Sequence, residues 1–188
     1  SSIPPTPHQA PVLTLGETMA LFRATAFGSL AHISGFELGF GGAESNVAIA
    51  LQRLGAPTIW LGRIGDDSLG ERITRELRAE GLDVRATVDS RAPTGLMIRE
   101  HRTPSTSQVT YYRSRSAGSQ LSAEDVDTVD VASCSLVHVT GITLALSESA
   151  AMAVTHAVAL ANAASVPVSF DINHRSRLWA DRDFAKAY

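Results

Sequence analysis

The sequence has one cysteine, no Gly-Lys-Ser or Gly-Lys-Thr triplet, and no apolar run long enough to span a membrane. One cysteine cannot form an internal disulfide, so we expect Cys134 to be a buried thiol in a reducing compartment. Without the triplet the chain has no Walker A loop for nucleotide phosphates. The net charge of −3 gives no electrostatic reason to expect nucleic acid or an anionic membrane as a partner. A cytoplasmic enzyme is the default expectation.

Two further signals are missing. The six histidines show no paired metal-ligand spacing, so we expect no metal site built on them. Residues 1–11 carry four prolines and lack the basic-then-apolar order of a signal peptide. We therefore expect residues 1–11 to be a disordered leader.

From residue 12 onward, short apolar runs alternate with amphipathic stretches. The pattern predicts strands at 12–16, 58–64, 135–139 and 166–172, and helices at 44–54, 69–77 and 147–164. Gly55 and Gly81 are the expected helix stops. Strands that alternate with helices of this length predict an α/β fold, with a mostly parallel sheet covered on both faces.

Two β-rich stretches, 94–102 and 108–115, have no helix between them and predict a hairpin. Like residues 36–40, they interrupt the alternation of strands and helices, so we expect a flap beside the main sheet. Residues 181–188 look like the opening of a helix, after which a doubly wound domain would normally continue. We therefore expect the carboxyl-terminal part of the domain to be missing from this chain.

The segment Phe-Gly-Gly-Ala-Glu-Ser-Asn at 40–46 carries the strongest chemical signal. Gly41 and Gly42 let a ligand approach the backbone, and the helix start behind them offers unpaired N–H groups to an oxygen-rich ligand. Asn46 can direct its amide into the same space. A tight turn with a locally bonded Asn46 explains these residues equally well. The dinucleotide pattern G-x-G-x-x-G does not fit, because Glu44 occupies the third glycine position.

Five motifs in order resemble the PfkB (ribokinase-like) family of carbohydrate kinases. Residues 41–55 and 61–70 resemble its amino-terminal signature, and three later motifs are similar to those of 2-keto-3-deoxygluconate kinases. These are Tyr111-Tyr112-Arg113 with Ser116-Ala117-Gly118-Ser119, His138-Val139-Thr140-Gly141-Ile142, and Asp171-x-Asn173-x-Arg175-x-x-Leu178-Trp179. The similarity runs from about residue 12 to residue 179.

The resemblance implies a ribokinase-like central sheet flanked by helices, with a small β-lid. It places a partial domain at 12–188, with lid segments at about 19–40 and 94–115. The implied reaction is the ATP- and Mg²⁺-dependent phosphorylation of a small sugar acid, best matched by 2-keto-3-deoxygluconate. Family lids often pair between subunits, so a homo-oligomer through the lid is expected.

In the family, the catalytic aspartate and the phosphate-binding glycine loop lie near the carboxyl end. No such Gly-Ala-Gly-Asp-like segment occurs before Tyr188. We therefore expect this chain to carry the sugar-binding part, to contain no catalytic residue and to lack kinase activity by itself.

The resemblance also implies the site residues. Those at the substrate are Gly42, Ala43, Glu44, Ser45, Asn46, Tyr111, Tyr112, Arg113, Ile142 and Arg175. Arg113 is implied to pair with the sugar-acid carboxylate, because a planar guanidinium matches two carboxylate oxygens. Asn173 and Arg175 are implied to lie near the nucleotide phosphates or their metal.

The same residues also have simpler structural explanations. Tyr111 to Arg113 could be strand packing plus a solvated charge, and strand alternation separates Tyr112 from the other two. Asn173 could belong to a turn, with Arg175 on a solvated face. Met97 stands where kinases of this sugar acid commonly have a tyrosine, and it replaces a hydroxyl with a flexible apolar surface.

Two alternatives therefore remain open. One is a kinase of the same fold for fructose, ribose or a nucleoside, and the other is a non-catalytic sugar-binding remnant. Arg113 favours an anionic acceptor over a neutral one.

Overall fold

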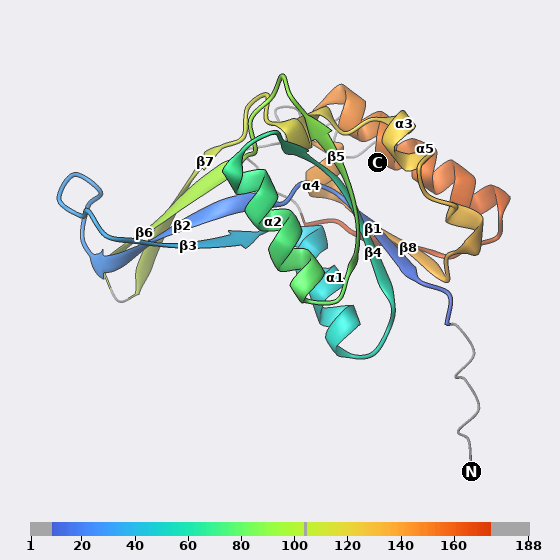
Figure 1. The fold of residues 1–188 in the computed structure, drawn as a ribbon, viewed down its shortest axis with the longest axis horizontal. Coiled ribbons are helices and arrows are strands. Elements are labelled where there is room, and N and C mark those ends of the chain that lie inside the picture. The colour runs from blue at the N-terminus through green and yellow to red at the C-terminus, as the bar shows by residue number, and fades with distance from the viewer. Residues whose placement is uncertain (1–8, 104, 174–188) are drawn as a thin grey trace, which may run out of the picture.

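The computed structural model describes residues 9–103 and 105–173, which form two sheets (Figure 1). The main sheet is parallel, and its strand order is β5-β4-β1-β8-β9. The strands are β1 (Val12–Leu15), β4 (Thr58–Gly65), β5 (Asp83–Asp89), β8 (Leu136–Thr140) and β9 (Val168–Asp171). The predicted α/β class with a mostly parallel sheet is confirmed. The helix expected at 181–188 and most of the expected leader lie outside the described residues.

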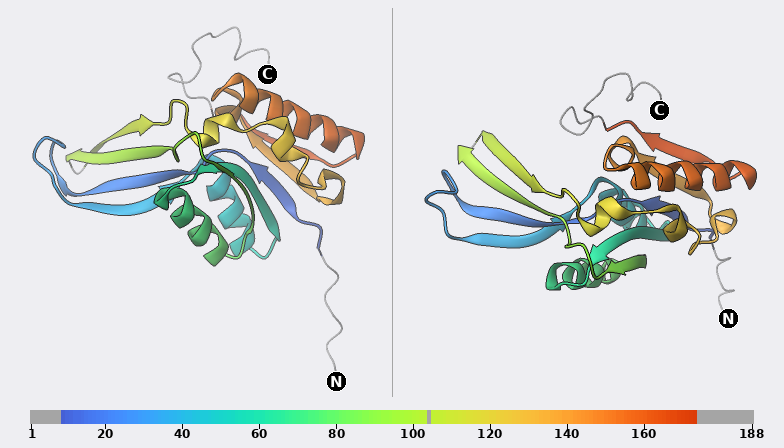
Figure 2. Two further views of the ribbon diagram at one scale, coloured as in Figure 1. Left: turned by 45° about the horizontal axis from the view of Figure 1, so that its top comes forward. Right: turned by 90° about the horizontal axis from the view of Figure 1, so that it is seen from above.

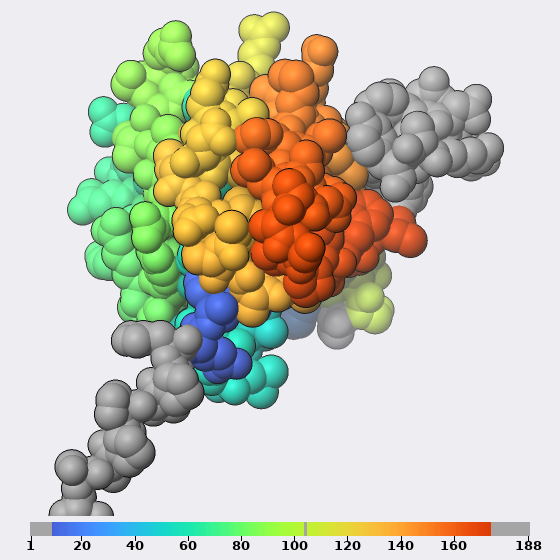
Figure 3. Space-filling view, turned by 90° about the vertical axis from the view of Figure 1, so that its right-hand side faces the viewer, coloured from blue at the N-terminus to red at the C-terminus, as the bar shows by residue number. Residues whose placement is uncertain are grey.

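Helices cover both faces of the main sheet (Figure 2). The helices α1 (Ala43–Arg53) and α2 (Ser68–Ala79) pack on one face. On the other face lie α3 (Ala123–Val126) and α5 (Glu148–Ala163), and α5 lies in the orange part of the surface in Figure 3. The short elements η1 (Ala117–Gln120), η2 (Val131–Ser133) and α4 (Gly141–Leu144) complete the connections. Within 9–103 and 105–173, no helix is both long and apolar enough to cross a bilayer.

The apolar sequence of β4 explains its position near the centre of the sheet. Ile59 and Leu61 are buried in the cluster beneath α5, whereas Trp60 and Ile64 are buried in the cluster beneath α1 and α2. Successive side chains on a strand point to opposite faces, so both faces of β4 need apolar residues. This two-sided burial produces the continuous apolar run seen in the sequence.

The helix boundaries follow the capping residues. The Asp67 carboxylate accepts a hydrogen bond from the Gly70 backbone N–H at 2.8 Å at the start of α2, and Ser147 accepts one from Ala150 at 3.0 Å at the start of α5. Gly55 and Gly81 follow α1 and α2 with φ of 90° and 85°, as expected of helix stops.

A second sheet, which we call the lid sheet, projects away from the main sheet (Figure 1). Its strands, in the order β3-β2-β6-β7, are β2 (Met19–Phe27), β3 (Phe36–Gly41), β6 (Leu96–Thr103) and β7 (Thr106–Tyr112). The predicted hairpin is confirmed, because β6 and β7 pair antiparallel. The sequence pattern did not reveal β2 as a separate strand; it pairs parallel with β6 and antiparallel with β3.

An ion-pair network ties the end of β4 to the segment after the lid sheet. Arg63 donates through Nε to Asp125 Oδ2 at 2.7 Å, and the Thr87 hydroxyl donates to Asp125 Oδ1 at 2.7 Å. Burial alone would raise the pKa of Asp125, but the hydrogen bonds from Arg63 and Thr87 outweigh it and hold this pKa below its ordinary value of 3.8. The ionised carboxylate of Asp125 therefore stabilises the fold.

Replacing Asp125 with asparagine should lower the free energy of unfolding at pH 7 by about 1–3 kcal/mol, because Arg63 loses the nearer of its two charged partners and keeps only Asp89, at 3.5 Å. Since the folded pKa is depressed, the stabilisation is present above pH 3.8 and is lost as the wild type is acidified through the folded pKa. Urea unfolding of both proteins at several pH values measures this difference.

Asp83→Asn is the matched control. Asp83 pairs with Arg85 at 2.8 Å on the exposed surface, and such a pair contributes at most about 1 kcal/mol. If both variants lose the same free energy of unfolding at pH 7, the Arg63 network contributes no more to stability than an exposed ion pair.

Candidate functional site

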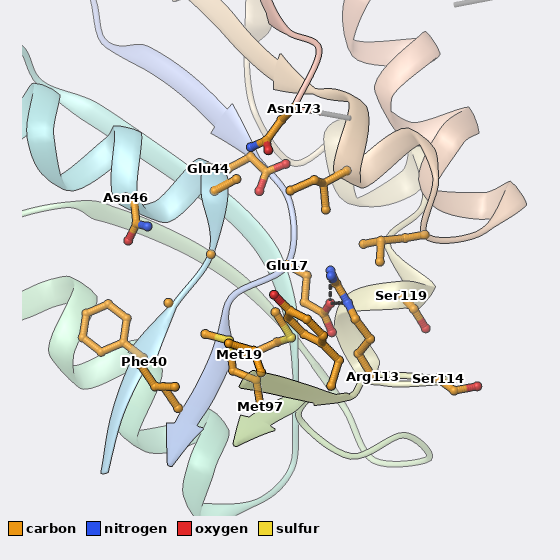
Figure 4. A pocket seen from close by; sticks show the side chains of 18 of the residues that line it. Glu17, Met19, Phe40, Glu44, Asn46, Met97, Arg113, Ser114, Ser119 and Asn173 are labelled. Atoms are coloured by element: carbon orange, nitrogen blue, oxygen red, sulfur yellow. Dashed lines mark hydrogen bonds and ion pairs between the residues drawn. The ribbon is translucent and has the colours of Figure 1, made fainter. Parts of the chain in front are cut away.

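A pocket of about 1460 Å³ lies where the carboxyl ends of main-sheet strands meet the lid sheet (Figure 4). Glu17 follows β1, Ile142 follows β8, and Asp171 ends β9, and all three line the pocket. The carboxyl ends of parallel strands meet at one edge of a sheet, where open α/β sheets bind their ligands. The position is therefore the one expected for a small-molecule site.

The start of α1 forms one wall of the pocket. Gly42 caps the helix in an extended conformation, with φ of −166°, so its backbone angles suit any residue. Its requirement for glycine is steric, because a Cβ at Gly42 would lie 2.4 Å from the Glu17 carbonyl oxygen and 3.2 Å from the Thr18 Cα. This close approach places the first N–H groups of α1, together with Asn46, beside the pocket.

Glu44 also lies on this wall, and its carboxylate is largely engaged within the protein. Its Oε1 accepts hydrogen bonds from the hydroxyls of Thr140 at 2.6 Å and Thr143 at 2.5 Å. Burial raises the pKa of Glu44; the two hydroxyls and the positive charge of Arg113 act in the opposite direction without cancelling it. Glu44 thus connects α1 to the end of β8 at the edge of the pocket.

The opposite wall comes from the lid sheet. Tyr111 and Arg113 line the pocket, and the Arg113 guanidinium carbon lies 5.9 Å from the centroid of the Tyr111 ring. Arg113 Nε and Nη2 lie 2.7 and 2.6 Å from Glu17 Oε2. The side chains of Arg113 and Glu17 are only 12% and 1% exposed, so this ion pair is nearly removed from water.

The structure brings most of the predicted site residues together at this pocket. Those that line it are Gly42, Ala43, Glu44, Asn46, Tyr111, Arg113, Ile142 and Asn173.

Two predicted residues lie outside the pocket wall, and a third is not among the described residues. Ser45 is fully buried, and its hydroxyl donates to the Gly42 carbonyl oxygen at 3.3 Å, so it stabilises the start of α1 instead of lining the pocket. Tyr112 is 58% exposed and absent from the pocket wall, because strand alternation turns it away from Tyr111 and Arg113. Arg175 lies outside the described residues.

Several pocket residues were not selected from the sequence. Glu17 is the most important, and its one signal was an acidic residue directly after the glycine that closes the first strand. Met19 lines the pocket beside Met97, and a Cβ at Gly41 would lie 3.1 Å from Met97 Cε. Two thioethers therefore cover one side of the pocket with flexible apolar surface. Arg99 and Arg115 add positive charge to the lining.

The parallel sheet covered by helices, with a pocket between its carboxyl edge and a small second sheet, places the protein in the class of α/β domains that bind a small molecule at the ends of their strands. The chain belongs to the pfkB family of carbohydrate kinases, whose family model matches residues 9–188.

The similarity to individual family members is close. A 2-dehydro-3-deoxygluconokinase from Bacillus subtilis is 40% identical over 172 residues, which are 90% of this chain and 53% of the relative. The crystal structure of a PfkB protein from Polaromonas sp. JS666 superposes with a TM-score of 0.90 at 35% identity, covering 95% of this chain and 60% of that one. An E. coli structure in complex with ATP and Mg²⁺ has a TM-score of 0.80 at 26% identity, covering 89% of this chain and 54% of that one. The chain thus spans about half the length of the curated relative it matches.

Replacing Gly42 with alanine should lower the free energy of unfolding by about 1–3 kcal/mol, because the added Cβ forces α1 away from the Glu17 backbone. Gly39→Ala is the matched control in the preceding strand, since nothing lies within 4 Å of a Cβ there. We expect Gly39→Ala to change stability by about 0.5 kcal/mol or less. Chemical unfolding of both variants measures the difference. Equal changes in the free energy of unfolding would show that the close approach at Gly42 does not exclude a Cβ.

Proposed function

We propose that this chain is the sugar-binding part of an ATP-dependent kinase whose acceptor is the sugar acid 2-keto-3-deoxygluconate. The observation that carries the proposal is the shared pocket, in which the glycine-led start of α1 faces Arg113 from the lid sheet. Helix N–H groups and the Asn46 amide suit the hydroxyls of a sugar, and a guanidinium suits its carboxylate. The 40% identity to a 2-dehydro-3-deoxygluconokinase supports the same acceptor.

In this proposal different pocket residues contact different parts of the substrate. Gly42, Ala43 and Asn46 meet the hydroxyls, while Tyr111 and Arg113 close over the acid end. Ile142, at the end of β8, contributes an apolar or backbone contact. Ser45 supports the start of α1 from outside the pocket wall, and Tyr112 has no direct contact with the substrate in this proposal.

ATP and Mg²⁺ are the proposed phosphoryl donor and metal. Asn173 and Asp171 line the pocket at the end of β9, and amide and carboxylate oxygens are ligands that suit Mg²⁺. The related E. coli structure in complex with ATP and Mg²⁺ supports the assignment. A kinase that draws on ATP is expected to act in the cytoplasm.

The test uses protein produced from the complete reading frame and measures ADP formation with 2-keto-3-deoxygluconate, fructose, ribose and adenosine. We expect kcat/KM for the sugar acid to exceed that for each neutral acceptor by about tenfold or more. Arg113→Met should raise KM for the sugar acid by about tenfold or more, because the carboxylate loses a charged hydrogen-bond partner.

Arg85→Met is the matched control for the loss of an arginine, because Arg85 pairs with Asp83 on the surface away from the pocket. It should leave both kinetic constants unchanged. A preference of the wild type for a neutral sugar would overturn the sugar-acid proposal.

A neutral acceptor such as fructose is the second candidate, and one observation favours it. Arg113 is already paired with Glu17, so part of its charge is compensated before any ligand binds. The acceptor panel separates the two candidates directly.

We also propose that two copies of the protein associate through the lid sheet. The lid sheet projects from the domain (Figure 1) and has β3 and β7 as its outer strands. Phe27 and Phe36 are 64% and 39% exposed on it. Unpaired outer strands with exposed aromatic side chains favour association.

Gel filtration with light scattering should therefore give a dimer for the protein from the complete reading frame. Phe36→Glu should shift it to a monomer, because a charge would be buried at the contact. Leu54→Glu is the control, since Leu54 is 84% exposed at the end of α1, outside the lid sheet. A monomeric wild type would refute the proposal.

A further inference from the structure

The side chain of Glu17 is almost completely buried, with only 1% of it exposed. A Cβ at Gly95 would lie 2.4 Å from Glu17 Oε1, and a Cβ at Gly118 would lie 2.3 Å from Glu17 Cγ. Real Cβ atoms do not approach other atoms this closely, so both positions require glycine for the carboxylate to fit. The structure thus surrounds Glu17 with backbone from the start of β6 and from η1.

The two carboxylate oxygens of Glu17 have separate partners. Ser116 donates its hydroxyl to Oε1, while Arg113 directs Nε and Nη2 to Oε2. Ser116 and Arg113 both follow β7, so Glu17 fixes the segment after the lid sheet through two contacts. Figure 4 shows the guanidinium lying against Glu17 and reaching toward the centre of the pocket.

This contact leaves a defined part of the guanidinium for a ligand. A guanidinium has five N–H donors in a fixed plane, and Glu17 takes the edge formed by Nε and Nη2. Among the described residues, no hydrogen bond or ion pair involves Arg113 Nη1. The end of the guanidinium that carries Nη1 and the second Nη2 proton can therefore receive two carboxylate oxygens side by side.

We propose that Glu17 is a positioning residue for acid recognition: it holds Arg113 by one edge so that the opposite end faces the substrate carboxylate. This rests on the proposed function. The substrate class it selects is a small sugar acid whose carboxylate approaches the guanidinium end-on. Glu17 acts through Arg113 and also compensates the arginine charge while the pocket is empty.

A double-mutant cycle on protein from the complete reading frame tests the proposal. Wild type, Glu17→Gln, Arg113→Met and the double variant are compared for KM and kcat with 2-keto-3-deoxygluconate. Glu17→Gln should raise KM about tenfold with kcat within about threefold, because the guanidinium loses its fixed orientation. In the double variant KM should equal that of Arg113→Met alone, because Glu17 has nothing left to position.

A stability measurement accompanies the cycle. Arg113→Met leaves the buried Glu17 carboxylate without its cation, so adding Glu17→Gln to it should raise the unfolding temperature. If Glu17→Gln alone does not fold, Glu17→Asp replaces it in the cycle, since it keeps the charge on a shorter side chain. Glu17→Asp should then raise KM for the sugar acid in the same non-additive way.

The outcomes separate this proposal from the proposed function. A wild type that does not phosphorylate the sugar acid rejects both. A wild type that phosphorylates it, with KM unchanged in the Glu17 variant or with effects that multiply in the double variant, rejects the positioning role alone. A raised KM in the single variant and no further rise in the double variant support it.

Discussion

The contact between Gly42 and the backbone of Glu17 is the constraint on which the pocket depends. It brings the start of α1 against the connection between β1 and β2, so the main sheet and the lid sheet share one junction. The Glu17 side chain extends the same junction to the end of β7 through Arg113 and Ser116. One residue therefore joins the helix wall of the pocket by its backbone and the lid wall by its carboxylate.

The buried charges of Glu17 and Arg113 at the pocket are paired with each other before any ligand binds. One oxygen of the buried Glu44 carboxyl group, Oε1, accepts hydrogen bonds from two threonine hydroxyls, and Glu17 pairs with Arg113. A buried charge without a partner is costly, so these contacts allow acids and an arginine to surround a half-enclosed cavity. A ligand that binds here must add to these contacts instead of replacing them, which favours ligands with several oxygen atoms in fixed positions.

The main-sheet strands predicted from the sequence are present because two-sided burial leaves a strong apolar signal, as in β4. The hairpin at β6 and β7 was also predictable, since β-rich residues flank a short polar turn. β5 was missed because it is an outer strand with charged residues such as Asp83 and Arg85. β2 was not resolved as a strand because its outer half is exposed and its pairing with β6 joins residues far apart in the chain.

The sequence by itself determined the α/β class, the glycine-led start of α1 and the family, because local periodicity, capping residues and ordered motifs are properties of neighbouring residues. It also separated Tyr112 from Tyr111 and Arg113 by strand alternation. Only the tertiary structure showed that Arg113 is held by Glu17, which lies 96 residues away. No pattern in the chain records such a pair, because it forms only when the residues after β7 are brought against the connection between β1 and β2.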